Sequence, residues 1–231
     1  MQKPFRRGLT DGLPIAVGYL SVSFGFGILA VRLGLPSWAA VLISMTNLTS
    51  AGQAAGVEII AAGGALLEMA LTQLVINLRY ALMGFSLSQR LDATFTTPRR
   101  LLLSFGITDE VFAVASARPG RLTASYMAGL ILLPVAGWSL GTLLGAVAGE
   151  WLPAAVTDAM GLLLYGMFIA IILPPARANK RVMAVVLGAA GVSAIFYYLL
   201  PMVGSGFAVI LSALAAAVAG ALLFPVEEEC V

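Results

Sequence analysis

Three polar side chains lie inside the apolar stretch LTQLVINLRYALMGFSL, residues 71–87. They are Gln73, Asn77 and Arg79, and all lie well inside the longer apolar run 65–87. Ionisable and amide groups in such surroundings are costly, so they mark substrate sites or proton relays by default. A second interpretation is that Arg79 extends along its own helix and reaches the polar boundary of the apolar layer, as long basic side chains do.

Two adjacent acids, Asp109 and Glu110, lie inside a second apolar stretch, SFGITDEVFAVAS. Arg79 would balance one of them, and the other would be protonated or paired with a cationic ligand. A zwitterion fits this set, with its carboxylate near Arg79 and its ammonium at Asp109 or Glu110. The acids also follow Gly106 and Thr108 in an order typical of a helix start. In a polar turn they would be no more than solvated helix caps.

A third polar stretch, SMTNLTSAGQAAG, interrupts the apolar run 38–62 and contains Asn47, Ser50 and Gln53. Ser50 and Gln53 have the S-x-x-Q spacing of a capping box, which predicts that a new helix begins there. The free N–H groups of that helix would attract a carboxylate. The alternative is that the small residues only allow neighbouring helices to approach closely.

On a helix, residues 71–87 place polar side chains on two faces about 120° apart. Gln73 and Asn77 share one face with Tyr80, whereas Arg79 lies on the other with Glu68 and Thr72. Both faces must therefore meet protein or water. We predict that Asn47, Ser50, Gln53, Gln73, Asn77, Arg79 and Tyr80 bind substrate, and that Asp109 and Glu110 bind a proton or an ammonium group.

The composition places these segments in a membrane. Of the 231 residues, 60% are hydrophobic and 10% are charged, and the mean hydropathy is +0.99, as in polytopic membrane proteins. We expect a single all-α membrane domain over residues 1–231 that keeps its N-terminus, because no signal-peptide cleavage site follows it. A net charge of +2 spread over short loops disfavours nucleic-acid binding.

Enzymatic chemistry is poorly supported. The sequence contains no histidine, so Gly204-Ser205-Gly206 cannot serve a serine–histidine hydrolase. There is no P-loop, and Asp109 with Glu110 is a poor magnesium ligand set. We expect no enzyme activity, no cofactor and no metal. The single cysteine, Cys230, excludes an internal disulfide.

Six to eight membrane segments are predicted, since a span needs about 20 apolar residues. The apolar runs are 13–33, 38–62, 65–87, 122–149, 152–175, 182–200 and 203–224, with a shorter one at 101–117. If all eight cross, the loop 88–100 with its three arginines lies outside, against the positive-inside rule. Alternatively, the run 38–62 is broken or re-entrant near residues 44–56, and the run 101–117 is broken or re-entrant as a whole. Every basic cluster then lies inside, together with both termini. We favour this second topology.

Four motifs in this order resemble the AzlC family, the large subunit of bacterial branched-chain amino acid exporters. They are GLPIAVGYLSVSFGFG near the start, AGQ at 51–53, INLRYALMG at 76–84 and FGITDEVFA at 105–113. The resemblance covers residues 8–120 well. Two departures stand out: Tyr80 occupies a position where the family often has histidine, and AGQAAG replaces a form in which the glutamine lies further on and an aromatic residue follows.

The resemblance implies a secondary transporter subunit that exports valine, leucine, isoleucine and perhaps methionine across the bacterial inner membrane. It also implies a small hydrophobic partner of the AzlD type. Proton coupling is expected, and a proton path through the family's histidine cannot apply here. A passive channel or a structural subunit of a membrane complex is the alternative, with an intramembrane enzyme a more distant one.

Overall fold

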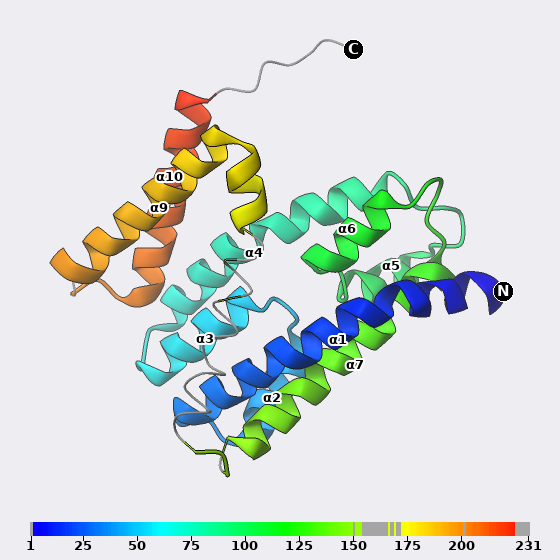
Figure 1. Ribbon diagram of the computed structural model, residues 1–231, viewed down its shortest axis with the longest axis horizontal. Helices are drawn as coiled ribbons and strands as arrows, with labels where there is room; N and C mark the ends of the chain where they lie inside the picture. The colour runs from blue at the N-terminus through cyan, green and yellow to red at the C-terminus, as the bar shows by residue number, and fades with distance from the viewer. Residues whose placement is uncertain are drawn as a thin grey trace.

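The computed structural model describes residues 2–149, 151–153, 166, 169, 172–200 and 202–224. Its elements are all helices (Figure 1): α1 (Gln2–Arg32), α2 (Ser37–Thr46), α3 (Ala51–Ala61), α4 (Leu66–Ser88), α5 (Thr97–Ser104), α6 (Asp109–Ala117), α7 (Ala124–Ala148), α9 (Lys180–Leu199) and α10 (Ser205–Leu223). Within these residues, five helices are long and apolar enough to cross a membrane, namely α1, α4, α7, α9 and α10. The predicted all-α polytopic fold is confirmed; the span predicted at 152–175 lies mostly outside the described residues.

Helices α1 and α7 form the central pair and run side by side in the same direction (Figure 1). A stripe of glycines on α7, Gly137, Gly141 and Gly145, contacts the backbone of α1 at successively later positions. Small residues at every fourth position let membrane helices pack backbone to backbone. The pair therefore provides a rigid frame for the shorter elements.

The polar stretch 44–56 breaks its apolar run into two helices. Helix α2 ends at Thr46, and α3 begins at Ala51 after Ser50, which has φ +51° and is the one described non-glycine residue with positive φ. Gln53 Oε1 accepts a hydrogen bond from the Ser50 N–H at 3.3 Å, as the predicted capping box requires. The predicted helix start at Ser50 is confirmed.

The acidic stretch contains the second break, between α5 and α6. Thr108 is the N-cap of α6, and its Oγ1 accepts from the Val111 N–H at 3.5 Å. Asp109 and Glu110 occupy the first turn of α6, where carboxylates interact favourably with the helix dipole. Gly106 packs directly on Ile131, in the second turn of α7, so the break lies beside α7, about two turns in from its start.

Loop contacts show that α5 and α6 enter and leave on the same side. After α4, Arg90 donates to the carbonyl oxygens of Ser116 at 2.6 Å and Gly120 at 3.0 Å. Leu91 and Leu122 form a β-bridge. The end of α4, the start of α5 and the end of α6 therefore all lie beside the start of α7.

The pair α2 and α3 enters and leaves on the opposite side. Because α1 and α7 run in the same direction and α4 ends beside the start of α7, α4 starts where α1 ends. The connections 33–36 and 62–65 therefore lie together at that far end, with the break between α2 and α3 inserted between them. Both segments predicted to be broken are thus re-entrant.

Three of the four basic clusters lie at the end of the molecule where α1 begins, which we call the basic side: Lys3, Arg6 and Arg7; Arg90, Arg99 and Arg100; and Arg118 and Arg121. The fourth cluster, Arg177, Lys180 and Arg181, lies next to and within the start of α9, which Figure 1 places away from the start of α1. The start of α10 contacts the start of α4 through Gly206 and Glu68, and α9 runs back against α10 (Figure 1). The end of α10 thus lies beside the start of α9 and away from the start of α1 (Figure 1), and the placement of both termini on the cytoplasmic side stays a prediction.

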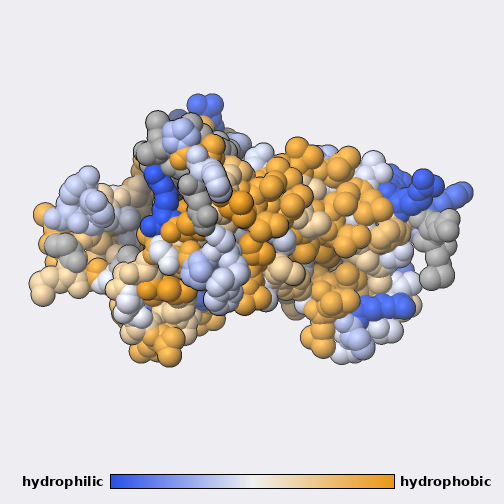
Figure 2. Space-filling model, turned by 90° about the horizontal axis from the view of Figure 1, so that it is seen from below, coloured by the Kyte–Doolittle hydropathy of each residue, from blue (hydrophilic) through white to orange (hydrophobic). Residues whose placement is uncertain are grey.

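The surface is suited to lipid. Many large apolar side chains on the spans are exposed, among them Leu74 and Leu78 of α4 and Tyr197 and Tyr198 of α9. Figure 2 shows that apolar side chains cover most of one face, with a hydrophilic patch at the end near the start of α1. The chain packs its core between helices and presents the rest of its apolar surface outward, as a membrane protein does.

Candidate functional site

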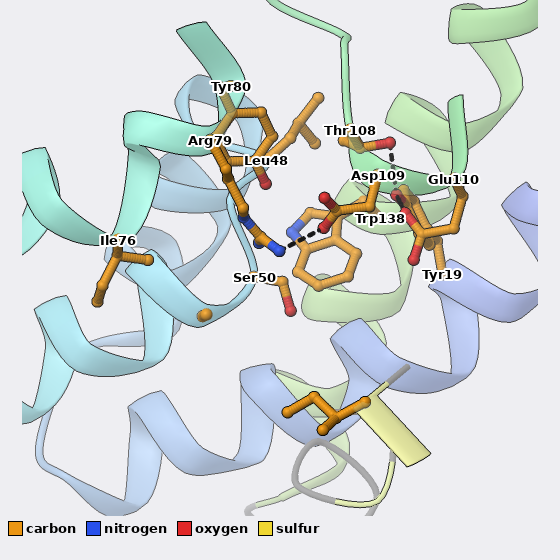
Figure 3. Close-up of a pocket in the computed structure, with 12 residues that line it drawn as sticks. Tyr19, Leu48, Ser50, Ile76, Arg79, Tyr80, Thr108, Asp109, Glu110 and Trp138 are labelled. Carbon is orange, nitrogen blue, oxygen red and sulfur yellow. Dashed lines mark hydrogen bonds and ion pairs between the residues drawn. The ribbon is translucent and has the colours of Figure 1, made fainter. Parts of the chain in front are cut away.

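The two breaks meet at a cavity of about 360 Å³, which we call the charged cavity (Figure 3). Helix α3 begins at one side of it and α6 at another, and α1, α4 and α7 complete its wall. The polar side chains that line it are Tyr19, Ser50, Arg79, Tyr80, Thr108, Asp109 and Glu110. Two helix starts and three charged groups thus converge on one space near the middle of α4 and α7.

Arg79 forms an ion pair with Asp109 across this cavity, with 2.7 Å between Nη1 and Oδ2. The two side chains come from α4 and α6 and point toward each other (Figure 3). They retain 41% and 30% exposure, so both remain accessible from the cavity. The guanidinium also lies 5.1 Å from the Tyr80 ring centre, within cation–π range. Arg79 is directed at Asp109, and the interpretation as an arm reaching the polar boundary does not describe it.

Glu110 is held by a tyrosine from a distant helix. The Tyr19 hydroxyl, on α1, donates to Glu110 and lies 2.6 Å from Thr108 Oγ1. A hydroxyl has one proton and two lone pairs, so Tyr19 donates to the carboxylate while Thr108 donates to Tyr19. This chain of hydrogen bonds ties the start of α6 to α1 and fixes the position of the second acid.

The rest of the charged cavity is apolar. Its apolar lining consists of Leu48, Ala51, Ile76, Trp138 and Ile172. The Trp138 ring is held in place by edge-to-face contact with Tyr19, with centroids 5.1 Å apart and an interplanar angle of 77°. A ligand here would meet a charged group on one side and aliphatic or aromatic carbon on the other.

The amide side chains open into a different space of about 400 Å³, which we call the amide cavity. Its polar lining is Asn47, Thr49, Gln73, Asn77, Tyr80 and Ser104. Leu48 and Tyr80 line both cavities and lie between them. Gln73 and Asn77 of one polar face of α4 thus line the amide cavity, and Arg79 of the other face lines the charged cavity. Glu68 and Thr72, on the same face as Arg79, lie against Gly206 of α10 instead.

Two of the amides hold the start of α3 against α4. Gln73 Nε2 donates to the Gly52 carbonyl oxygen at 2.7 Å, and Asn77 Nδ2 donates to Gln73 Oε1 at 3.0 Å. Asn47 Oδ1 accepts from the Thr49 N–H at 3.0 Å and shapes the turn between α2 and α3. These side chains position the break that forms one wall of the charged cavity.

Gln53 lies in neither cavity. It is 2% exposed, and its Nε2 donates to Ser44 Oγ at 3.1 Å. Ser44 is hydrogen-bonded in turn to Thr142 of α7 at 2.7 Å. A buried, fully connected network of this kind fixes helices relative to one another, and here it joins α2, α3 and α7.

The structure thus brings Ser50, Arg79, Tyr80, Asp109 and Glu110 together and separates them from Asn47, Gln73 and Asn77. Sequence reasoning missed Tyr19 and Trp138, and it named Thr108 only as part of a helix start. Tyr19 lies in the GLPIAVGYLSVSFGFG stretch, and a polar tip inside an apolar run was an available signal; Trp138 offered none. Among the described residues, no group of three or more His, Cys, Asp or Glu side chains is placed to hold a metal ion.

Comparison with known proteins places these features in a family. A family model described as AzlC protein matches residues 14–152. The inner membrane protein YgaZ of Escherichia coli is 34% identical over 176 residues, covering 73% of this chain and 72% of the relative. An uncharacterized membrane protein of Archaeoglobus fulgidus is 33% identical over 223 residues, covering 95% and 93%. One from Helicobacter pylori strain J99 is 25% identical, covering 78% of each chain. No solved structure gives a significant match.

Proposed function

The chain belongs to the AzlC family of membrane proteins, and from that premise we propose that it is a secondary transporter subunit that exports aliphatic amino acids. The observation that carries this proposal is the Arg79–Asp109 pair facing a cavity that also has an apolar wall. Such a site offers opposite charges to the backbone of an amino acid and carbon to its side chain.

The dimensions of the charged cavity agree with a small ligand. Its volume of about 360 Å³ falls at the low end of the range of about 300–1,000 Å³ for ligand pockets. The aliphatic wall of Leu48, Ile76 and Ile172 favours the side chains of valine, leucine, isoleucine and methionine over polar ones. Transport, rather than catalysis, is the proposed role.

The re-entrant breaks support a carrier that opens its site to each side in turn. Helix breaks at membrane depth occur where they line a cavity, and many transporters build their midplane sites from them. Here one re-entrant segment comes from each side of the molecule. Movement of either segment would open the charged cavity toward its own side.

Glu110 is our candidate for proton coupling. The three charged groups sum to −1, because Arg79 opposes two carboxylates, and a zwitterionic substrate does not change that sum. A proton on Glu110 would neutralise the loaded site, and the Tyr19–Thr108 hydrogen bonds offer it partners. In this scheme the amino acid leaves as a proton enters.

The proposed setting is the bacterial inner membrane, with the basic side toward the cytoplasm as the positive-inside rule requires. We also propose that both ends of the chain are cytoplasmic, and that the chain binds the small hydrophobic AzlD-type partner implied by the family. Helix α4 has only 17% of its most apolar window buried although it carries Gln73, Asn77 and Arg79, which agrees with cover from a second subunit.

The test is export from cells that accumulate valine. Asp109→Asn and Arg79→Ala should each abolish export, since each leaves the other charge unpaired and removes one contact to the zwitterion. Membrane levels of both variants, measured by immunoblot, should match the wild type. Normal export by both variants would show that the charged cavity is not the substrate site.

Purified protein in liposomes, with and without the small subunit, separates a carrier from a channel. In liposomes preloaded with excess unlabelled leucine, a carrier transiently accumulates labelled leucine above its external concentration, without an ion gradient. A passive channel only lets the label equilibrate.

A further inference from the structure

Three hydrogen-bond donors that line the charged cavity have no acceptor among the described residues. They are the Ser50 hydroxyl, the Arg79 Nε–H and the Trp138 indole Nε1–H, and each atom is buried. A buried donor without an acceptor costs free energy, so native proteins rarely leave one unpaired. Three such donors in one cavity indicate a ligand that accepts hydrogen bonds.

Trp138 is the most informative of the three. Its side chain is 1% exposed, and it lies near the middle of α7, where water is scarce. A phenylalanine would supply the same edge-to-face contact with Tyr19 without burying a polar atom. The indole nitrogen therefore has no evident structural role, although its ring does.

The three donors come from different directions. Ser50 stands at the start of α3, Arg79 projects from α4, and Trp138 from α7; Figure 3 shows the indole ring close to both Ser50 and Asp109 in this view. The guanidinium is positively charged, and the start of α3 adds the positive end of a helix dipole. Their common ligand group should be small, acceptor-only and negatively charged.

We propose that Ser50, Arg79 and Trp138 form the subsite for the substrate carboxylate, with the Trp138 indole as a dedicated donor. This inference rests on the proposed amino acid transport. It places the ammonium group at the acidic side of the cavity, near Asp109 and Glu110, and directs the side chain toward Leu48, Ile76 and Ile172. It also gives α7 a direct contact with substrate.

The test compares two ligands on the full-length chain in nanodiscs by calorimetry. L-Leucine carries the carboxylate, and 3-methylbutylamine is the same molecule without it. Trp138→Phe keeps an aromatic ring and removes the donor. Loss of one hydrogen bond to a charged group corresponds to about a tenfold weaker affinity. Trp138→Phe should therefore weaken leucine binding about tenfold and leave 3-methylbutylamine binding unchanged.

Trp38→Phe is the matched control, because Trp38 is 70% exposed and lies outside the cavity; it should bind both ligands as the wild type does. If Trp138→Phe does not fold, Ser50→Ala carries the same expectation. Equal leucine affinity in wild type and Trp138→Phe, or equal weakening of both ligands, would overturn the carboxylate subsite alone. Absence of leucine binding by the wild type would overturn the transport proposal and the subsite with it.

Discussion

At the scale of single residues, Arg79 and Asp109 illustrate how charged side chains are stabilised inside an apolar protein segment by pairing with one another. Neither carboxylate nor guanidinium is isolated: Arg79 meets Asp109 at 2.7 Å, and Glu110 accepts a hydrogen bond from the Tyr19 hydroxyl. Removing one member of the pair leaves the other charge without compensation inside an apolar segment, where an unpaired charge is costly. The site is therefore sensitive to each of its members.

Gly52 is a residue at which a single methyl group would disturb the site. A Cβ there would lie 2.7 Å from Gln73 Oε1 and would also touch Thr49 Oγ1. Gly52→Ala should therefore displace Gln73, shift the start of α3 together with Ser50, and weaken leucine binding at least fivefold. The measurement is a leucine titration on purified protein.

Gly84→Ala is the control for this change, because a Cβ at Gly84 in α4 meets nothing within 4 Å. Its leucine affinity should equal that of the wild type. Unchanged affinity in Gly52→Ala would mean that the α3–α4 contact does not position the site.

At the scale of elements, both helix breaks were predictable from local sequence. Ser50 and Gln53 specify the start of α3, and Thr108 with two acids specifies the start of α6, because capping depends on residues three or four positions apart. The two polar faces of α4 were also predictable from the helical period. What faced each of them was not, since the partners lie elsewhere in the chain: Gly52 for Gln73, Asp109 for Arg79 and Gly206 for Glu68.

The α1–α7 pair depends on the absence of side chains at its contact. A Cβ on Gly141 would lie 2.9 Å from Leu20 Cα and would collide with Ser23 Oγ. Gly141→Ala should overpack this contact at a cost of about 1–3 kcal/mol, which lowers the melting temperature by about 5 °C for a chain of this length. The melting temperature is measured by heating the protein in detergent and recording the loss of soluble monomer.

Gly18→Ala provides the comparison on the same helix pair. Gly18 is on α1, and a Cβ there meets nothing within 4 Å, so its melting temperature should stay at or slightly above that of the wild type. Equal melting temperatures for the two variants would show that α1 and α7 do not pack through the Gly141 position.

At the scale of the whole molecule, charge and topology agree. The positive-inside rule and the positions of the arginines favoured two re-entrant segments before any contact was known. The Arg90 contacts to Ser116 and Gly120 give the same topology independently. The division of polar residues between two cavities, however, depends on how the two re-entrant segments meet, and no local pattern in the sequence encodes that meeting.

The side of the membrane on which the loop between α4 and α5 lies distinguishes the re-entrant topology from one with eight full spans. Both Ala62 and Ala93 are exposed, and they lie on opposite sides of the molecule. In a chain whose Cys230 is replaced by alanine, Ala62→Cys should react in intact cells with a maleimide that cannot cross membranes. Ala93→Cys, on the basic side with Arg90 and Arg99, should react only after the cells are made permeable. With eight full spans, the loop 88–100 lies outside, so Ala93→Cys would react in intact cells. Labelling of Ala93→Cys without permeabilisation would therefore exclude the re-entrant arrangement with a cytoplasmic basic side.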